Sequence, residues 1–358
     1  MWDQAEPRRY TRAIAADALV RAMMTAFVAR LSGLREIAER MNSVLGTNNF
    51  SSLSHALGRP STLAFVRLLV DHLQTTHAPG KDELVALDSM AVTLPVTQRH
   101  RCAKYNKTTV GGGVLWAFMI DAAREACPVK VIQTMAGSWG DSALMANVKL
   151  IAKGPVYLMD RGFWSLDLVE RWRHEAVRFI VRARYNTIYE VARKLSEPQA
   201  YGKRGWIELD AWVKLGWEKH KSHPEARMIR ARIGEEVIIL VTAERRWSAG
   251  RVLDAYRKRE RIERFHRLLK DELGLAHLYN FSHTGMMTLL YIALLTALLL
   301  LLGIDADTGP SETAKRLRQA IRRLRQSIGM GNIWRRNTNT IKRKPSARIY
   351  KWQTQQNL

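Results

Sequence analysis

The chain has 358 residues, of which 47% are hydrophobic and 25% charged, which excludes an intrinsically disordered protein. Lys and Arg number 57 against 33 Asp and Glu, and a net charge of +24 indicates a polyanionic partner, nucleic acid before anionic membrane. Two cysteines, Cys102 and Cys127, exclude a disulfide framework and a cysteine zinc site and suit a reducing cytosol. The first ten residues mix charges and have no apolar run, so we expect no secretory signal.

The first 80 residues have the pattern of a small helical domain. Apolar residues recur at helical spacing over 31–41. Ser51 or Ser52 is a candidate cap for a short helix ending at residue 57, and Ser61 for a longer helix ending at residue 73. This order suits a helix-turn-helix DNA reader, but any small all-helical domain has the same pattern.

From residue 84 onward, short apolar runs predict strands. The runs cover 84–87, 114–120, 129–135, 155–159 and 177–183. Helices are predicted between the later runs, at 141–151 and at 165–175 with Ser165 as the cap. The alternation over 84–185 predicts an α/β domain with a mixed sheet.

Residues 186–245 interrupt this alternation. They contain scattered tyrosines, tryptophans and glycines and one clear strand at 237–242. We expect a strand-rich insertion here, followed by one long amphipathic helix over 249–273.

Two later segments allow two interpretations each. The stretch 286–304 has 19 uncharged residues, enough to cross a bilayer, but a helix buried on all sides in a large domain has the same composition, and we favour that. Residues 311–358 hold 13 Lys and Arg against one acid, Glu312. Such a tail binds phosphates without reading sequence, or it merely keeps the chain soluble.

Two predicted strands end in an aspartate, Asp88 after 84–87 and Asp160 after 156–159. Functional groups gather at strand ends in open α/β sheets, and two adjacent carboxylates are stable when a divalent cation lies between them. The signal is weak alone, because most such aspartates only cap a turn or helix.

The predicted helix 249–273 carries four polar residues on one face. At 100° per residue, Tyr256, Arg259, Glu263 and Lys270 fall within about 60° of arc. Ile262, Phe265, Leu268 and Leu269 fall on the opposite face, which we expect to pack on a core. A solvated face with i,i+4 ion pairs would have the same pattern. His100, His174, His266, His277 and His283 lack metal-ligand spacing, and we interpret them as structural or surface residues.

The Tyr-x2-Arg-x3-Glu-x6-Lys spacing of these four residues resembles the signature of DDE transposases of bacterial insertion sequences, in the insertion-sequence-four group. The stretch DRGF at 160–163 is similar to the second-acid motif of that family, and LVALDSM at 84–90 to its first-acid strand. Residues 113–142 resemble its intervening strands and 270–278 the segment after its acidic helix. The resemblance covers roughly 84–300.

The resemblance implies a ribonuclease H-like mixed-sheet core in which Asp88, Asp160 and Glu263 are catalytic and bind two Mg²⁺ ions, with Mn²⁺ as a substitute. Mg²⁺ prefers oxygen ligands, and two ions suit in-line phosphodiester cleavage and strand transfer. The implied DNA-binding residues are Tyr256, Arg259 and Lys270. Arg161, which follows the second acid, is a further candidate, and pairing with a neighbouring residue is the alternative for it. An aromatic residue of the insertion would stack on a flipped base; the candidates are Trp206, Trp212, Trp217 and Trp247, for each of which core packing is the alternative.

The expected organisation has a helical N-terminal DNA-binding domain at 1–80 and the ribonuclease H-like core at 81–185 and 246–305. The strand-rich insertion at 186–245 interrupts the core, and a basic helical tail follows at 306–358. The expected partners are double-stranded DNA, as terminal inverted repeats and target, and a second copy in the synapse, in the bacterial cytosol without a membrane. The rival functions are a nuclease without strand transfer and a non-catalytic DNA-binding remnant.

Overall fold

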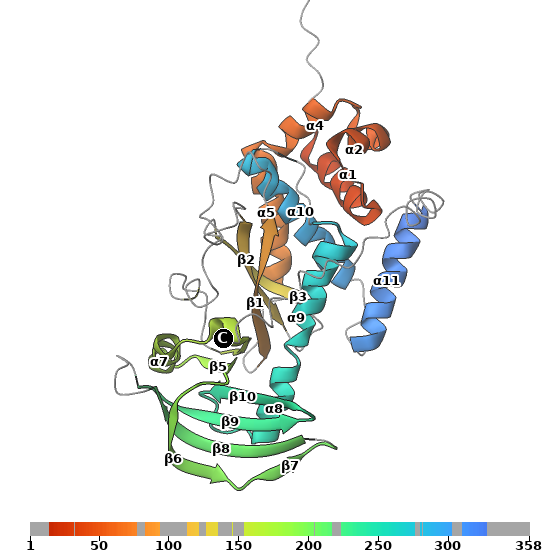
Figure 1. Ribbon diagram of the computed structural model, residues 1–358. Coiled ribbons are helices and arrows are strands. Elements are labelled where there is room, and N and C mark those ends of the chain that lie inside the picture. The colour runs from red at the N-terminus through yellow and green to blue at the C-terminus, as the bar shows by residue number, and fades with distance from the viewer. Residues whose placement is uncertain are drawn as a thin grey trace, which may run out of the picture.

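The computed structural model describes residues 14–31, 33–76, 83–93, 113–121, 127–134, 145, 154–203, 205–216, 223–275, 280, 282–302 and 310–327. The predicted helix at 141–151 lies outside the described residues, except for the helical Met145. The described chain combines helices with one mixed sheet, so the predicted α/β class is confirmed (Figure 1).

Five helices form the N-terminal part: α1 (Ala16–Ala29), α2 (Leu34–Arg40), α3 (Asn42–Leu45), α4 (Phe50–Leu57) and α5 (Pro60–Thr76). The caps predicted for α4 and α5 are wrong. Helix α4 begins one residue before Ser51, because the Asn49 side chain accepts a hydrogen bond from the Ser51 N–H at 2.8 Å. Helix α5 begins at Pro60, whose fixed φ and missing N–H suit the first helical position.

In the described residues, ten strands form a single sheet in the order β3-β2-β1-β4-β5-β10-β9-β8-β6, with β7 paired to β8. β1 is parallel to β4 and β4 to β5, whereas all other pairs are antiparallel. The strands are β1 (Leu84–Thr93), β2 (Gly113–Asp121), β3 (Cys127–Thr134), β4 (Val156–Met159), β5 (Arg178–Arg182), β6 (Tyr189–Ser196), β7 (Gln199–Tyr201), β8 (Gly205–Leu215), β9 (Glu225–Ile233) and β10 (Glu236–Thr242).

In the order β3-β2-β1-β4-β5, neighbours among the first three strands are antiparallel, and β1, β4 and β5 are parallel to one another. This arrangement is consistent with a ribonuclease H-like core. The range 186–245 contains β6 to β10, which extend the same sheet from the β5 edge through the antiparallel β5–β10 pair. In Figure 1 these strands form the lower end of the molecule, and α1, α2 and α4 lie at the opposite end.

Alternating residues of the central strands enter two separate cores, because successive side chains of a strand point to opposite faces. Leu84 and Ala86 of β1 join the core beneath α1, α5 and α10 (His283–Leu302), whereas Val85 and Leu87 join a second core. Helix α7 (Leu166–His174) covers that second core with Trp172, whose ring lies 5.2 Å from that of Phe179. Both faces of the sheet centre are therefore buried, which explains its continuous apolar runs.

The predicted single helix at 249–273 is instead three segments: α8 (Ala249–Arg257), α9 (Glu260–Arg267) and a π-helical turn, η3 (Leu268–Glu272). Between α8 and α9 the backbone tightens, and the Arg259 N–H donates to the Tyr256 carbonyl three residues back. No Gly or Pro lies at 257–260, so we attribute the break to tertiary contacts of Arg259, described below. The predicted core face is confirmed, since Ile262, Phe265, Leu268 and Leu269 are buried.

Helix α10 is the one described helix long and apolar enough to cross a bilayer, with a mean hydropathy of 2.4. Of that apolar window, 72% is buried within the protein, which favours the core-helix interpretation. Asn280, just before α10, donates to the Ser54 carbonyl of α4 at 3.1 Å and accepts from the Ser282 N–H at 2.8 Å. The start of α10 is thus fastened to the N-terminal helices.

Further contacts connect the terminal helices to the rest. Arg30, directly after α1, donates to the backbone carbonyls of Asp271 and Glu272 in η3. Helix α11 (Pro310–Ser327) packs against α1 and α10, burying Ile321, and its basic residues Lys315, Arg316 and Arg322 are exposed. The end of α1 therefore lies against η3, and α11 lies against α1 and α10.

Candidate active site

Asp88, Asp160 and Glu263, predicted from separate parts of the chain, converge on a single guanidinium, that of Arg259. Its Nη1 lies 3.8 Å from Asp88 Oδ2, and its Nη2 lies 3.8 Å from Asp160 Oδ2 and 2.9 Å from Glu263 Oε1. Three carboxylates from β1, the end of β4 and α9 thus surround one cation.

The sheet register explains how the two aspartates meet. β1 and β4 are parallel neighbours with Leu87 opposite Met159, so Asp88 and Asp160 occupy the next position on each strand. The prediction that Asp88 ends its strand is wrong: β1 continues to Thr93 because β2 pairs with it beyond the end of β4, and Asp88 lies opposite Phe118. Asp160 does follow its strand directly, as predicted.

Arg259 is the electrostatic centre of this group, with 12% of its side chain exposed. Burial lowers the pKa of its guanidinium, but Asp160, Tyr256, Asp88 and Glu263 outweigh that effect and raise it. Arg259 is therefore a permanent positive charge that offsets the repulsion among the carboxylates.

Tyr256 lies at the end of α8 with its hydroxyl 3.5 Å from Asp160 Oδ1. It is 7% exposed, and burial followed by the Asp160 charge raises the pKa of its phenol well above the ordinary value. Tyr256 is therefore neutral and acts as a donor toward Asp160.

His266 was interpreted from the sequence as structural or surface, yet its Nδ1 lies 3.6 Å from Asp88 Oδ2. Burial, with smaller effects of Lys270 and Arg259, lowers its pKa to about 3, so the imidazole is neutral at pH 7. The helical spacing contained the signal: at 100° per residue His266 falls only about 20° outside the arc shared by Tyr256, Arg259, Glu263 and Lys270.

The two other predicted phosphate-binding residues lie at the edges of this group. Lys270 is exposed on η3; desolvation lowers the pKa of its ammonium, while Asp271 and Asp88 oppose that shift. Arg161 is exposed in η2 (Arg161–Phe163), directly after Asp160.

The four tryptophans proposed for base stacking have different environments. Trp206 on β8 is 48% exposed. Trp212 is partly buried, with the Arg245 guanidinium 5.2 Å from its ring centre. Trp247 is buried between Arg251 at 4.4 Å and Arg178 at 5.6 Å. Trp217 lies outside the described residues.

The donor set suits a hard divalent cation, because Asp88, Asp160 and Glu263 offer only carboxylate oxygens. In the described part of the chain, no three acidic, histidine or cysteine side chains are grouped closely enough to hold a metal. Arg259 lies among the three carboxylates instead. The residues fit the ion chemically, and their present spacing is that of an arginine-centred cluster.

A strongly basic pocket adjoins the carboxylates, with a volume of about 780 Å³. Tyr256, Arg259 and Glu263 line it together with five more arginines: Arg182, Arg257, Arg264, Arg267 and Arg318. Arg318 comes from α11, so the basic C-terminal helix forms part of this wall. A pocket with six arginines and three glutamates attracts a polyanion to the acidic cluster.

Comparison with curated proteins finds no similar relative. A family model described as "Transposase DDE domain" matches residues 79–326, more than half of the chain. The match includes β1, β4 and α9, which carry the three converging carboxylates. The chain therefore belongs to the DDE transposase domain family.

Proposed function

We propose that this transposase binds the ends of a bacterial insertion sequence of the insertion-sequence-four group and catalyses metal-dependent cleavage and strand transfer. The single observation that supports this most is the convergence of Asp88, Asp160 and Glu263 on Arg259. Around them lie Tyr256 and Lys270, the other members of the four-residue signature. The strand order of the core supports the ribonuclease H-like part of the proposal.

Asp88, Asp160 and Glu263 would hold two Mg²⁺ ions, or Mn²⁺ in their place. Bound there, the metals would supply activation of an attacking oxygen and stabilisation of a leaving oxygen. The chain's own residues bind and orient the DNA. Arg259 presents a planar fork of N–H donors that suits a phosphate, and releasing its hold on the three acids frees both partners for substrate.

The neighbouring residues would position the scissile phosphate. Tyr256 contributes a neutral hydroxyl, Lys270 a point charge and Arg161 a second guanidinium at the rim. His266, neutral beside Asp88, adds no second positive charge to compete with a cation. In the proposed sequence, water attacks the phosphodiester at the transposon end and frees a 3′-hydroxyl, which then attacks target DNA; a hairpin at the end is an optional intermediate.

The partners follow from the same chemistry. Two ends must meet in one synapse, so we propose a homodimer on DNA, acting in the bacterial cytosol without a membrane. The helices of 1–80 and the basic tail 306–358 would bind DNA outside the catalytic core, since phosphate contacts supply most of the non-specific affinity. Trp206, Trp212, Trp217 and Trp247 remain the proposed set for stacking on a flipped base.

The test is cleavage and joining of a DNA end with Mg²⁺, comparing the wild type with Glu263→Gln and with Glu235→Gln. We expect Glu263→Gln to lower the cleavage rate by at least about 1,000-fold while end binding persists, because binding depends on phosphate contacts. Glu235 is exposed and lines neither described pocket, so its variant should cleave normally. Chelation of the metal should stop cleavage and spare binding.

The outcomes separate the rival functions. Cleavage without a joined product from a pre-cut 3′-hydroxyl end would favour a plain nuclease. Binding without cleavage in Mg²⁺ would indicate a non-catalytic remnant. Near wild-type cleavage by Glu263→Gln or Asp88→Asn would refute the assignment of the site.

A further inference from the structure

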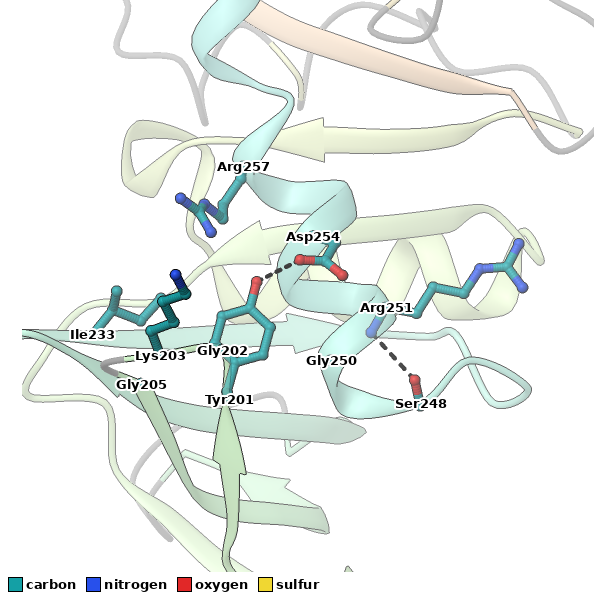
Figure 2. Close-up of a pocket in the computed structure, with 10 residues that line it drawn as sticks. All are labelled: Tyr201, Gly202, Lys203, Gly205, Ile233, Ser248, Gly250, Arg251, Asp254 and Arg257. Carbon is teal, nitrogen blue, oxygen red and sulfur yellow. Dashed lines mark hydrogen bonds between the residues drawn. The ribbon is translucent and has the colours of Figure 1, made fainter.

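A second pocket lies beside α8, with a volume of about 910 Å³ (Figure 2). Its walls are the turn between β7 and β8, the end of β9 and the outer face of α8. The volume is within the range of sites that hold a ligand group. None of the residues predicted from the sequence as functional lines it.

Tyr201 builds this pocket by joining the strands to the helix. Its ring lies 3.8 Å from where a Cβ on Gly250 would be, so it packs on the first turn of α8. A Cβ on Gly205 would come within 2.9 Å of the same ring, so only glycine fits at the start of β8. The pocket is therefore a defined feature of the fold.

The charges of the pocket favour an anion. Three of its lining residues are basic, Lys203, Arg251 and Arg257, and one is acidic, Asp254. Asp254 Oδ1 accepts a hydrogen bond from the Tyr201 hydroxyl at 2.5 Å, so the one carboxylate already has a partner. Figure 2 shows Lys203 and Arg257 with their charged ends toward one another on one side of Tyr201.

Arg251 has a different role from these two. Figure 2 shows its side chain pointing away from Lys203, and its guanidinium lies 4.4 Å from the Trp247 ring centre. No carboxylate among the described residues forms an ion pair with Lys203, whose side chain is exposed. Arg257 interacts with the Tyr201 hydroxyl and with the charges of Asp254 and Glu260, which raise the pKa of its guanidinium. Lys203 adds a second positive charge on the same side of Tyr201, and an anion bound there would be attracted by both.

Arg257 connects this pocket to the active site, because it lines both this pocket and the pocket that contains Glu263. A chain of phosphates passing the carboxylates would reach Lys203 by way of Arg257, which both pockets share. We propose that Lys203 and Arg257 bind the DNA backbone phosphate on the flank of the cleavage position, and that this contact sets the path of the strand leaving the active site. The inference rests on the proposed function.

The test measures end binding by fluorescence anisotropy at several salt concentrations, in a Glu263→Gln background that keeps the DNA intact. Each of Lys203→Gln and Arg257→Gln should reduce the slope of log affinity against log salt by about 0.9 for duplex DNA, or about 0.7 for a single strand. Arg257→Lys keeps the charge and should retain the slope. Arg193→Gln, a matched loss of an exposed arginine on β6 outside both pockets, should also retain it.

Unchanged slopes in both glutamine variants, with Glu263→Gln still binding the end, would overturn this inference and leave the proposed function intact. An equal loss of slope in Arg193→Gln would also overturn it, because the effect would then be general charge. If the wild-type chain neither binds nor cleaves end DNA, the proposed function itself fails. Circular dichroism and urea unfolding verify that each variant is folded.

Discussion

The buried ion pair between Arg227 of β9 and Asp210 of β8 supports the strands next to α8, and we predict that Arg227→Met destabilises the fold strongly. Both side chains are 4% exposed, and the pair is bidentate, with N–O distances of 2.7 and 2.8 Å. Arg227 Nη1 also donates to the carbonyls of Trp247 at 2.6 Å and Glu244 at 3.2 Å. The same guanidinium thus holds two strands and the segment that leads into α8.

The expected cost is about 3–5 kcal/mol in the free energy of unfolding, because the variant leaves a buried carboxylate without its cation. Asp210 would keep only the distant Ser196 hydroxyl, at 3.4 Å, from its present side-chain contacts. Arg227→Met combined with Asp210→Leu removes both charges and should recover most of the loss. Arg232→Met is the matched control on the same two strands: Arg232 is 51% exposed and pairs with Glu208 at 2.9 Å, so its loss should cost at most about 1 kcal/mol.

Urea unfolding followed by tryptophan fluorescence measures these free energies, and amide hydrogen exchange over 244–257 reports whether the start of α8 opens locally. A cost for Arg227→Met no larger than that for Arg232→Met would refute the reasoning. If the double variant is as unstable as the single one, the contacts to Trp247 and Glu244, and not the unpaired charge, carry the energy.

Three further predictions concern a cap, a phosphate contact and pH. Asn49→Ala should lower the free energy of unfolding by about 1 kcal/mol, because it removes the acceptor for the Ser51 N–H. Asn49→Ser should retain most of that free energy, and equal unfolding midpoints for the wild type and the alanine variant would contradict the role of Asn49 as a cap. Lys270→Ala should leave the fold intact and reduce the salt slope of DNA binding by about 0.9, whereas an unfolded variant would show that Lys270 is structural. Burial raises the pKa of the Tyr291 phenol, so the folded state favours the neutral form. The free energy of unfolding should therefore fall as the pH rises above about 10, the pKa of the phenol in the unfolded chain. The fall should be smaller in Tyr291→Phe, and an equal pH dependence in the two proteins would contradict this prediction.

The sequence predicted features that depend on local pattern. The apolar run at 156–159 is a strand buried on both faces, and the helical spacing of Tyr256, Arg259 and Glu263 does place them together. Features that depend on distant partners were not predictable. β1 extends past Asp88 because of pairing with β2, and the break between α8 and α9 has no local glycine or proline.

For His266 the sequence contained part of the information, but the interpretation of this residue still differed from the structure. Its position on the helical face was available from the spacing, but a histidine there indicates function only once Asp88 is known to lie 3.6 Å away. The individual strands β6, β7, β8 and β9 were also missed. β6 is largely exposed and carries several charged residues, so it lacks the apolar alternation from which strands are predicted.

Helix α8 connects the strands of the insertion to the carboxylate cluster. Its first turn follows Trp247, whose carbonyl accepts a hydrogen bond from Arg227, and its last turn carries Tyr256 beside Asp160. A nine-residue helix is only about 14 Å long, so displacing one end moves the other. We therefore expect Arg227→Met, under conditions where it remains folded, to slow cleavage although it touches no carboxylate of the site. Normal cleavage by a variant with measurably faster exchange over 244–257 would show that the insertion stabilises the protein without positioning Tyr256.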